Sequence, residues 1–226
     1  MNKVSFAEPY SFDSLFDRIS TFIEDHSVLS NELVIAKIDF FRITGKLNES
    51  DKDFSNRMNA FLLWFAFDWK CEDYLKTPFE LYKESVTQTG FNADEMTLVL
   101  DMEHHIHSLF ETVKLTDDLA LIRDLFSRKK YEVVQPDVLF GSRKGIYYET
   151  RIFKIGQHYR FSNYFIQHPD EVKKDVKKRC KQVKKQGDSI KPFLMQLHAY
   201  HTKWVRYRNI QLKSIYHFDK SLPEAK

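Results

Sequence analysis

The chain has 226 residues, 42% of them hydrophobic and 30% charged, with only 6 Gly and 6 Pro, a composition typical of a globular, helix-rich protein with one large domain or two small ones. Its two cysteines, Cys71 and Cys180, exclude a disulfide framework, and we therefore expect a reducing, cytoplasmic compartment. The longest apolar run, Phe61–Phe67, is far shorter than the roughly 20 residues that cross a bilayer, and the first residues contain no apolar signal core, so we expect no membrane partner.

The net charge of +3 hides an asymmetry between the two halves of the chain. Residues 1–118 carry 11 Lys and Arg against 22 Asp and Glu, whereas residues 119–226 carry 24 against 10. Such a division indicates either two surfaces that meet each other or a basic half that meets an anionic partner.

Residues 1–107 are predicted to form a helical domain. Apolar side chains recur at spacings of three and four in residues 11–26, which is the pattern of an amphipathic helix. The pattern continues over residues 32–45 and is predicted to end at Gly45, since glycine commonly terminates helices.

Three further helices are predicted in this half of the chain. One starts near Ser50 and becomes apolar on all sides at Phe61–Phe67, which predicts a central, fully buried helix. The next starts at Pro78, because proline suits the first helical position. The last is capped by Asn92 and runs into a histidine-rich segment.

Residues 108–168 contain short runs rich in β-branched and aromatic residues, separated by turn residues. The five predicted strands occupy residues 108–115, 119–126, 130–135, 145–155 and 158–167. Strands of this length and spacing predict a small, closed or nearly closed antiparallel β-barrel, in which the last two strands form a hairpin that turns at Gly156.

Residues 169–219 are predicted to return to helix and to form two basic C-terminal helices, followed by a frayed tail at residues 220–226. The first of these helices starts near Pro169 and ends at Gly187. The whole chain is thus predicted to be an α+β protein, with an N-terminal helical bundle, a small antiparallel β-barrel and two C-terminal helices.

Several segments together resemble a family of uncharacterised bacterial proteins. The matching motifs are F-L-x-W-F-x-F-D at residues 61–68, T-P-x-x-L-Y at residues 77–82, S-L-F-E at residues 108–111, and a hairpin with Leu121, Asp124, Leu125, Tyr131 and Val133. The resemblance implies a helical part followed by a small β module and brings no catalytic residue. Some relatives of this type also carry a Cys/His zinc motif of the SEC-C kind, which this chain lacks.

The segment DMEHHIHSLFE contains three of the nine histidines, flanked by carboxylates. On a helix, Asp101 and His105 share a face, as do Glu103 and His107, and such pairs can bind zinc. His104 and His105 would point about 100° apart, however, so they cannot join one metal from a continuous helix. We interpret the segment as a polar helix end, where the helix dipole favours histidine, with a metal site or a pH-responsive switch as the alternatives.

The densest positive charge lies in residues 173–185, where eight Lys and Arg residues stand against Asp175 alone. The following helix adds aromatic rings among cations. Cations neutralise phosphates and aromatic rings stack on bases, so this combination is consistent with nucleic acid, with an acidic protein surface and a plain solvated helix as the alternatives. The predicted binding residues are Lys173, Lys174, Lys177, Lys178, Arg179, Lys181, Lys184, Lys185, Tyr200, Lys203, Trp204, Arg206 and Arg208.

We therefore predict a non-enzymatic binding protein that uses no cofactor and no metal and presents its basic C-terminal helices to nucleic acid. The alternative is a protein-interaction adaptor or a homo-oligomer, in which these helices meet an acidic protein surface. A metal-dependent hydrolase using His105 or His107 is the third hypothesis. Salt-sensitive binding, a concentration-dependent mass and stoichiometric metal would separate the three.

Overall fold

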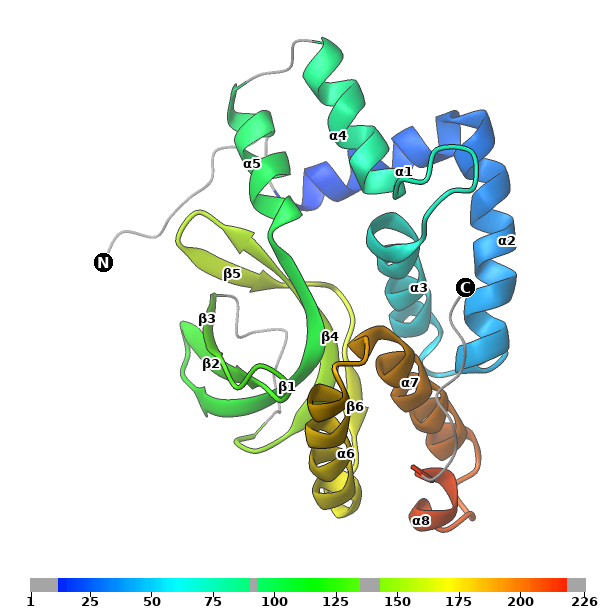
Figure 1. Cartoon of the computed structure of the whole chain (residues 1–226), viewed down its shortest axis with the longest axis vertical. Coiled ribbons are helices and arrows are strands. Elements are labelled where there is room, and N and C mark those ends of the chain that lie inside the picture. The colour runs from blue at the N-terminus through cyan, green and yellow to red at the C-terminus, as the bar shows by residue number, and fades with distance from the viewer. Residues whose placement is uncertain (1–11, 90–92, 135–142, 219–226) are drawn as a thin grey trace. The chain divides into compact units, whose positions relative to one another are not determined.

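The computed structural model describes residues 12–89, 93–134 and 143–218 (Figure 1). The chain divides into two compact units. Unit 1 comprises Met1–Asp39 and Phe61–His104, and unit 2 comprises Phe40–Ala60 and His105–Lys226. Helices and a six-stranded sheet are both present, which confirms the predicted α+β class.

Five helices are described before the first strand: α1 (Phe12–Asp25), α2 (Ser27–Thr44), α3 (Phe54–Asp68), α4 (Pro78–Thr89) and α5 (Ala93–Glu103). All five overlap segments for which the sequence predicts helix, although α2 begins at Ser27, five residues before its predicted segment of residues 32–45. The stripe predicted on α1 is confirmed, since the helix buries Phe12, Leu15, Ile19 and Ile23. The cap expected at Asn92 and the tail expected at residues 220–226 lie outside the described residues.

Helix α3 starts later, and is less buried, than its sequence predicts. The Asn48 amide donates to the Asp51 carboxylate over 3.0 Å, and the Asp51 amide donates to the Asn48 carbonyl over 2.9 Å, so a closed turn occupies the expected helix start. Phe65 is fully buried, but Leu62 is 42% exposed. The prediction of a helix buried on all sides is therefore wrong for the side that carries Leu62.

A buried carboxylate joins three helices of unit 1. Glu95 on α5 is only 3% exposed. It accepts a hydrogen bond from Arg18 on α1 over 2.6 Å and from the Tyr82 hydroxyl on α4 over 3.1 Å. Burial, followed by the nearby Glu95 charge, raises the pKa of Tyr82, which therefore stays a neutral donor to Glu95.

Six strands follow the helices: β1 (His105–Leu115), β2 (Leu119–Asp124), β3 (Lys130–Val134), β4 (Tyr147–Ile155), β5 (His158–Phe161) and β6 (Ile166–His168). They pair in the order β1-β2-β3-β5-β4-β6, and β1 also pairs with β4, so the first five strands form a ring of pairings. The predicted hairpin at Gly156 is confirmed, with Ile155 opposite His158. The pairing of β3 with β5 is parallel, so the prediction of a purely antiparallel arrangement is wrong for that pair.

The last strand predicted from the sequence is divided into β5 and β6 in the structure. Between them, Asn56 of the segment that opens α3 takes the place of a neighbouring strand. Its side-chain amide donates to the Phe165 carbonyl over 2.8 Å, and its oxygen accepts from the Phe165 amide over 2.9 Å. Because an asparagine satisfies both backbone groups of Phe165, the chain leaves the ladder there and rejoins it at β6.

Alternate residues of the strands point into two different cores, as the strand period of two requires. Phe110 and Tyr148 belong to a core built from strand residues, with Ile122, Val133 and Ile152. Their neighbours Leu109 and Tyr147 point the other way, into a core that the C-terminal helices complete.

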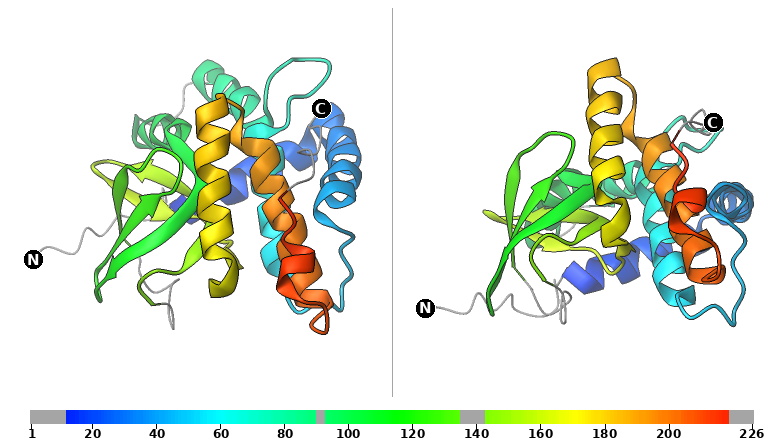
Figure 2. Two further views of the ribbon diagram at one scale, coloured as in Figure 1. Left: turned by 60° about the horizontal axis from the view of Figure 1, so that its bottom comes forward. Right: turned by 90° about the horizontal axis from the view of Figure 1, so that it is seen from below.

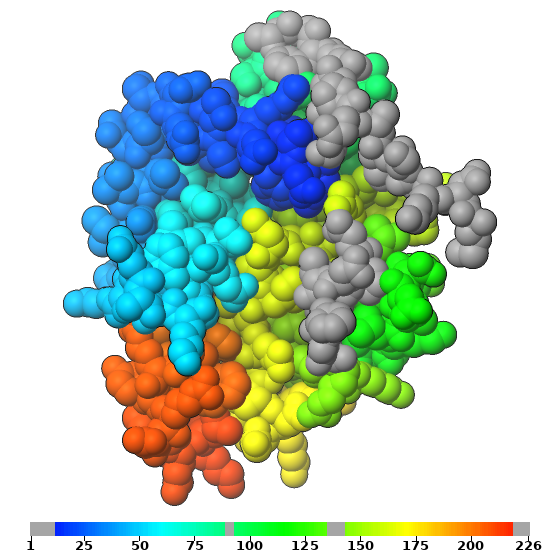
Figure 3. Space-filling model, turned by 180° about the vertical axis from the view of Figure 1, so that it is seen from behind, coloured from blue at the N-terminus to red at the C-terminus, as the bar shows by residue number. Residues whose placement is uncertain are grey.

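Three helices follow the strands: α6 (Lys173–Gln186), α7 (Ile190–Arg206) and α8 (Leu212–Ile215). Helix α7 packs against β6, where the His201 ring donates from Nδ1 to the Gln167 carbonyl over 2.7 Å. In Figure 3 the orange segment of α7 lies directly against the yellow segment that contains β6. None of the described helices combines the length and the hydrophobicity that crossing a bilayer would require.

Replacing Gly45 by Ala is expected to lower the free energy of unfolding by about 2 kcal/mol. Gly45 has φ +99°, a conformation that costs other residues roughly 1–2 kcal/mol. An added Cβ would also lie 2.9 Å from Cγ2 of Thr202. Urea unfolding of the single variant measures the total cost.

Two matched variants separate the two parts of this cost. Gly187→Ala should lower the free energy of unfolding only through the strain of a positive φ, which is +72° at this position. No described atom lies within 4 Å of the added Cβ. Adding Thr202→Ser to Gly45→Ala removes the methyl group and should restore part of the stability. Equal costs at Gly45 and Gly187 would show that the close approach to Thr202 contributes nothing.

Candidate functional site

Helix α6 is the basic helix that the sequence predicts, and its ends carry the expected signals. Acidic residues precede it in a short 3₁₀ turn, Asp170–Val172, where the positive end of the helix dipole favours them. At its C-terminus, Gly187 adopts φ +72° and its amide donates to the Lys184 carbonyl over 3.3 Å. The Asp188 amide reaches back to the Val183 carbonyl over 3.3 Å, and the two bonds close the helix end.

A narrow apolar seam fixes α6 to the strands of unit 2. Val176, Cys180 and Val183 are all fully buried and pack with Leu109 and Tyr147. Burial raises the pKa of Cys180 to about 12, so this cysteine remains a thiol and acts as a core residue. The seam occupies successive helical turns, and one side of α6 is therefore held in place along its whole length.

The opposite side of α6 carries a stripe of exposed lysines. Lys174, Lys178, Lys181 and Lys185 are all exposed. At 3.6 residues per turn they fall within about 60° of one another, on the side away from the seam. In Figure 2 α6 lies along the strands and beside α7, with its outer side uncovered by other elements of unit 2. We call these four residues the lysine stripe.

The remaining cations of α6 lie outside the lysine stripe, and three of them are half-buried. Lys177 and Arg179 are half-buried, and Lys184 is exposed on a flank. Lys173 is held at the start of the helix, where its Nζ lies 5.4 Å from the centre of the Tyr147 ring and pairs with Asp170. The hydrogen bond from Lys173 is the main reason that the pKa of Asp170 lies below its ordinary value. This pair partly neutralises the first turn of α6.

Three of the residues predicted on α7 take part in internal contacts. Tyr200 is 7% exposed and its hydroxyl donates to the His217 carbonyl. Trp204 is half-buried, with its ring 5.7 Å from the His201 ring. Arg206 bonds to the Asp51 carboxylate over 2.6 Å. These contacts hold the fold together and leave no open stacking face on Tyr200.

The other predicted residues of this region, Lys203 and Arg208, are exposed. The aromatic ring that the structure does place at the surface here is Tyr207, which is 53% exposed and precedes Arg208 in the chain. Of the predicted residues at the end of α7, Lys203 and Arg208 are therefore accessible, whereas Trp204 and Arg206 are half-buried and Tyr200 is buried.

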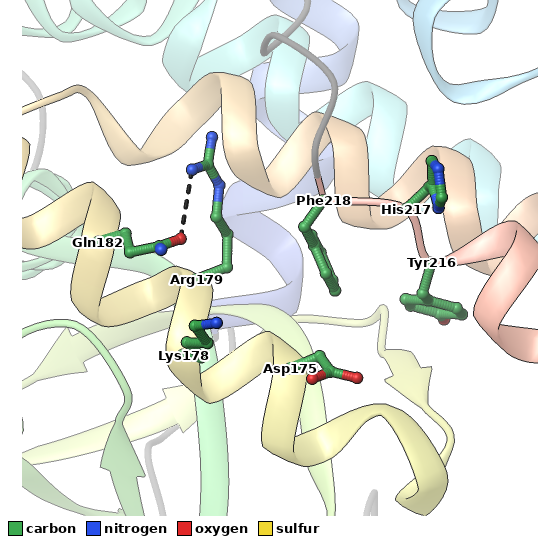
Figure 4. A pocket seen from close by; sticks show the side chains of 7 residues that line it. All are labelled: Asp175, Lys178, Arg179, Gln182, Tyr216, His217 and Phe218. Atoms are coloured by element: carbon green, nitrogen blue, oxygen red, sulfur yellow. Dashed lines mark hydrogen bonds between the residues drawn. The ribbon is translucent and has the colours of Figure 1, made fainter.

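A small pocket of about 240 Å³ lies beside the lysine stripe (Figure 4). Four of its residues come from one flank of α6 and three from the segment that follows α8. The lining residues are Asp175, Lys178, Arg179, Gln182, Tyr216, His217 and Phe218. Figure 4 shows the two groups facing each other across the hollow.

Sequence reasoning identified Lys178 and Arg179 of this pocket and missed the others. The α6 members are spaced at three, four and seven residues from Asp175, a spacing that places them on one helix flank. That spacing was visible in the sequence. The contribution of Tyr216, His217 and Phe218 was not, because it depends on how the chain returns after α7.

The histidine-rich segment does not have the geometry that the sequence predicts. Helix α5 ends at Glu103, and residues from His105 onward belong to strand β1. The interpretation that rests on helical spacing is therefore wrong for His105 and His107. The His105 ring packs 5.9 Å from the Phe153 ring, and Nε2 of His107 lies 3.0 Å from the Glu149 carboxylate.

No cluster of three or more His, Cys, Asp or Glu side chains within residues 12–89, 93–134 and 143–218 could hold a metal ion. His107 instead forms a pair with Glu149, which is 3% exposed. The hydrolase hypothesis thus has no ligand set within these ranges.

Neither the curated proteins nor the solved structures include a match to this chain. A family of unknown function, DUF7986, matches residues 19–204. The match includes all five described N-terminal helices in part or whole, all six strands, α6 and most of α7. Since it spans well over half of the sequence, the chain belongs to the family of unknown function DUF7986.

Proposed function

We propose that this protein is a non-enzymatic nucleic-acid-binding protein that contacts the phosphate backbone through the lysine stripe of α6. The observation that carries the proposal is the opposition of two faces on one helix. Val176, Cys180 and Val183 fix one face in a core, and four exposed lysines line the other. A fixed row of cations can neutralise successive phosphates without first ordering the helix that carries it.

The surroundings of α6 support the same proposal. Three more cations, Arg128, Lys129 and Lys130, are exposed at the turn between β2 and β3. Arg128 is close enough to the Tyr147 ring, which packs against the seam of α6, to act electrostatically on its hydroxyl. We also infer that the ring of paired strands closes into the small barrel that the sequence predicts, which would give α6 a rigid platform.

The kind of contact sets the expected specificity. Lysines recognise phosphates as point charges and do not read base sequence. Tyr200 and Trp204 are engaged inside unit 2, so we leave them out of the proposed surface. We therefore propose a surface with little sequence preference, and one that needs no cofactor and catalyses no reaction.

The test changes Lys174, Lys181 and Lys185 together to Gln, which removes three charges and keeps side chains that favour helix. Binding of labelled single- and double-stranded DNA and RNA is measured by fluorescence anisotropy from 50 to 300 mM salt. The wild-type protein should lose affinity steeply with salt. The variant should bind at least tenfold more weakly at low salt, with a salt slope flatter by about two to three, since each lost phosphate contact contributes about 0.7–0.9.

A matched control changes Lys37, Lys52 and Lys70, which are also exposed, to Gln. It removes the same charge from positions outside α6, so it should bind like the wild-type protein. If both triple variants lost the same affinity, net charge alone would explain the loss, and the result would contradict a defined binding surface on α6. Absence of binding at 50 mM salt would overturn the proposal and would favour an acidic protein surface as the partner of α6.

A further inference from the structure

The pocket between α6 and the segment after α8 is lined by aromatic rings and a carboxylate as well as by cations, whereas the lysine stripe consists of cations alone. It lies on the flank of α6 next to the stripe, and Lys178 belongs to both. Its volume of about 240 Å³ is below the roughly 300–1,000 Å³ of sites that hold drug-sized ligands. A ligand of this site is therefore small, or is one unit of a longer molecule.

One side of the pocket offers hydrogen-bond donors that suit an anion. The Arg179 Nε is buried, and no acceptor for it exists among the described residues. The same guanidinium makes one long bond, of 3.4 Å, from Nη1 to the Gln182 side chain. A guanidinium matches the geometry of a phosphate, and Lys178, which lines the same pocket, adds a second positive charge.

The other side of the pocket is aromatic. The Phe218 ring is half-buried and packs 6.0 Å from the Phe193 ring and 5.6 Å from the Tyr200 ring, so its position is fixed by the core behind it. The Tyr216 hydroxyl lies 3.1 Å from Nδ1 of His168. Because the hydroxyl is engaged there, Tyr216 lines the pocket with its ring. In Figure 4 Phe218 projects between the α6 side chains and Tyr216.

A carboxylate also lines the pocket. Asp175 lines the same pocket from the first turn of α6 and is exposed. A carboxylate cannot bind phosphate, but it accepts hydrogen bonds from amino and hydroxyl groups. The pocket therefore combines cations, a ring and a hydrogen-bond acceptor within one small volume. A nucleotide has the matching groups: a phosphate for the cations, a planar base for the ring, and N–H or O–H donors for the carboxylate.

We propose that this pocket binds a single nucleotide, with its phosphate on Arg179 and Lys178 and its base against Phe218. If the nucleotide is part of a strand bound by the lysine stripe, this inference rests on the proposed function. A base in a duplex is paired and stacked and cannot enter such a pocket, so the site would confer a preference for single strands. The same chemistry could also come from a free mononucleotide.

The experiment has two arms, both on the full chain. The first arm titrates adenosine 5′-monophosphate, with adenosine as the probe that lacks the phosphate, by following amide chemical shifts in NMR. The second compares a labelled twelve-nucleotide single strand with the duplex of the same sequence. We expect shifts at Arg179 and Phe218 with the monophosphate, much weaker ones with adenosine, and at least fivefold tighter binding of the single strand.

Three variants assign these effects to the pocket. Phe218→Leu keeps an apolar side chain and removes the ring, and it should reduce single-strand affinity at least fivefold while duplex affinity stays unchanged. Arg179→Gln should weaken binding of the monophosphate and of the single strand. Tyr207→Leu removes an exposed ring outside the pocket and should change neither. Melting temperatures close to that of the wild-type protein verify that each variant folds.

The outcomes separate this inference from the proposed function. Equal binding of single strand and duplex, unchanged in Phe218→Leu, overturns the pocket assignment and leaves the lysine stripe standing. Monophosphate binding that depends on Arg179, without binding of any strand, overturns the proposed function and supports a free mononucleotide as the ligand. A response of Tyr207→Leu equal to that of Phe218→Leu would overturn the assignment of the ring.

Discussion

Lowering the pH from 7 to 5 is expected to reduce the free energy of unfolding of unit 2 steeply, because three histidines are buried there in the neutral form. His168, His198 and His201 are 1%, 1% and 8% exposed. Burial is the main cause that lowers the pKa of all three, and it takes that of His168 to about 3. A charge on His201 would also oppose protonation of His168, and charges on His168 and His201 would oppose protonation of His198.

The charges that surround these histidines come from several elements. His198 on α7 lies near Arg57 of α3 and His107 of β1, both of which oppose its protonation. His201 also faces Asp53, which favours the charged form, but burial outweighs that attraction. None of the three histidines therefore has a partner that stabilises its charged form enough to restore the ordinary pKa.

The direction of the pH effect follows from proton binding. In the unfolded chain these histidines have pKa values of about 6.5, so below that pH the unfolded state binds protons that the folded state does not. Stability is then complete above about pH 6.5 and falls by about 1.4 kcal/mol per pH unit for each such histidine, down to its folded pKa. Asp51 and Asp170 have lowered pKa values, so their effect falls at lower pH, below the ordinary carboxylate range.

Urea unfolding at pH 7, 6 and 5 measures this slope. His198→Gln should lose stability at pH 7 but show a pH slope that is shallower by about 1.4 kcal/mol per unit. His158→Gln, at an exposed position of β5, should keep the wild-type slope. A wild-type stability that is constant from pH 7 to pH 5 would show that these histidines gain protons without unfolding.

The histidines illustrate what the sequence could and could not predict. The conspicuous group at residues 104–107 is close only along the chain, and it spans the end of a helix and the start of a strand. The sequence carries only a weak strand signal at this point, because polar and apolar residues alternate over His105, Ile106 and His107 but not at Ser108. The group that does share an environment combines β6 with α7, and only the fold brings these elements together.

Local signals predicted the elements well. The stripe of α1, the glycines that end α2 and α6, and the seam of α6 each follow from side-chain periodicity and backbone conformation over a few residues. The parallel pairing of β3 with β5 and the substitution of Asn56 for a strand neighbour depend on segments far apart in the chain. Periodicity within one segment carries no information about such contacts.

Arg206, one of the predicted binding residues, is a second case in which the sequence could not show the contacts of a side chain. Its place among cations on a basic helix predicted a role in binding. In the structure it bonds to the Lys46 carbonyl and to the Asp51 carboxylate, which is 155 residues away in the chain. With Arg57 it fixes the loop between α2 and α3, so this positive charge contributes to the fold of unit 2.

Replacing Arg57 by Met is expected to lower the free energy of unfolding by about 3–5 kcal/mol, because it removes a buried charge and leaves its partners behind. Arg57 is 1% exposed. Its guanidinium donates to the Gly45 carbonyl, to the Lys46 carbonyl over 3.1 Å and toward the Asp51 carboxylate over 3.5 Å. Methionine fills most of the same volume, so the cost measures chiefly the lost donors.

Three further variants define the origin of this cost in urea unfolding experiments. Arg57→Lys should recover only part of the stability, since one ammonium cannot reproduce a fork that reaches two carbonyls and a carboxylate. Arg208→Met removes an exposed arginine beyond the end of α7 and should cost less than about 0.5 kcal/mol. The double variant of Arg57 and Arg206 should lose less than the sum of the single variants, because the two side chains share Lys46 and Asp51. A loss below about 1 kcal/mol for Arg57→Met would show that Arg206 alone is sufficient to fix the loop.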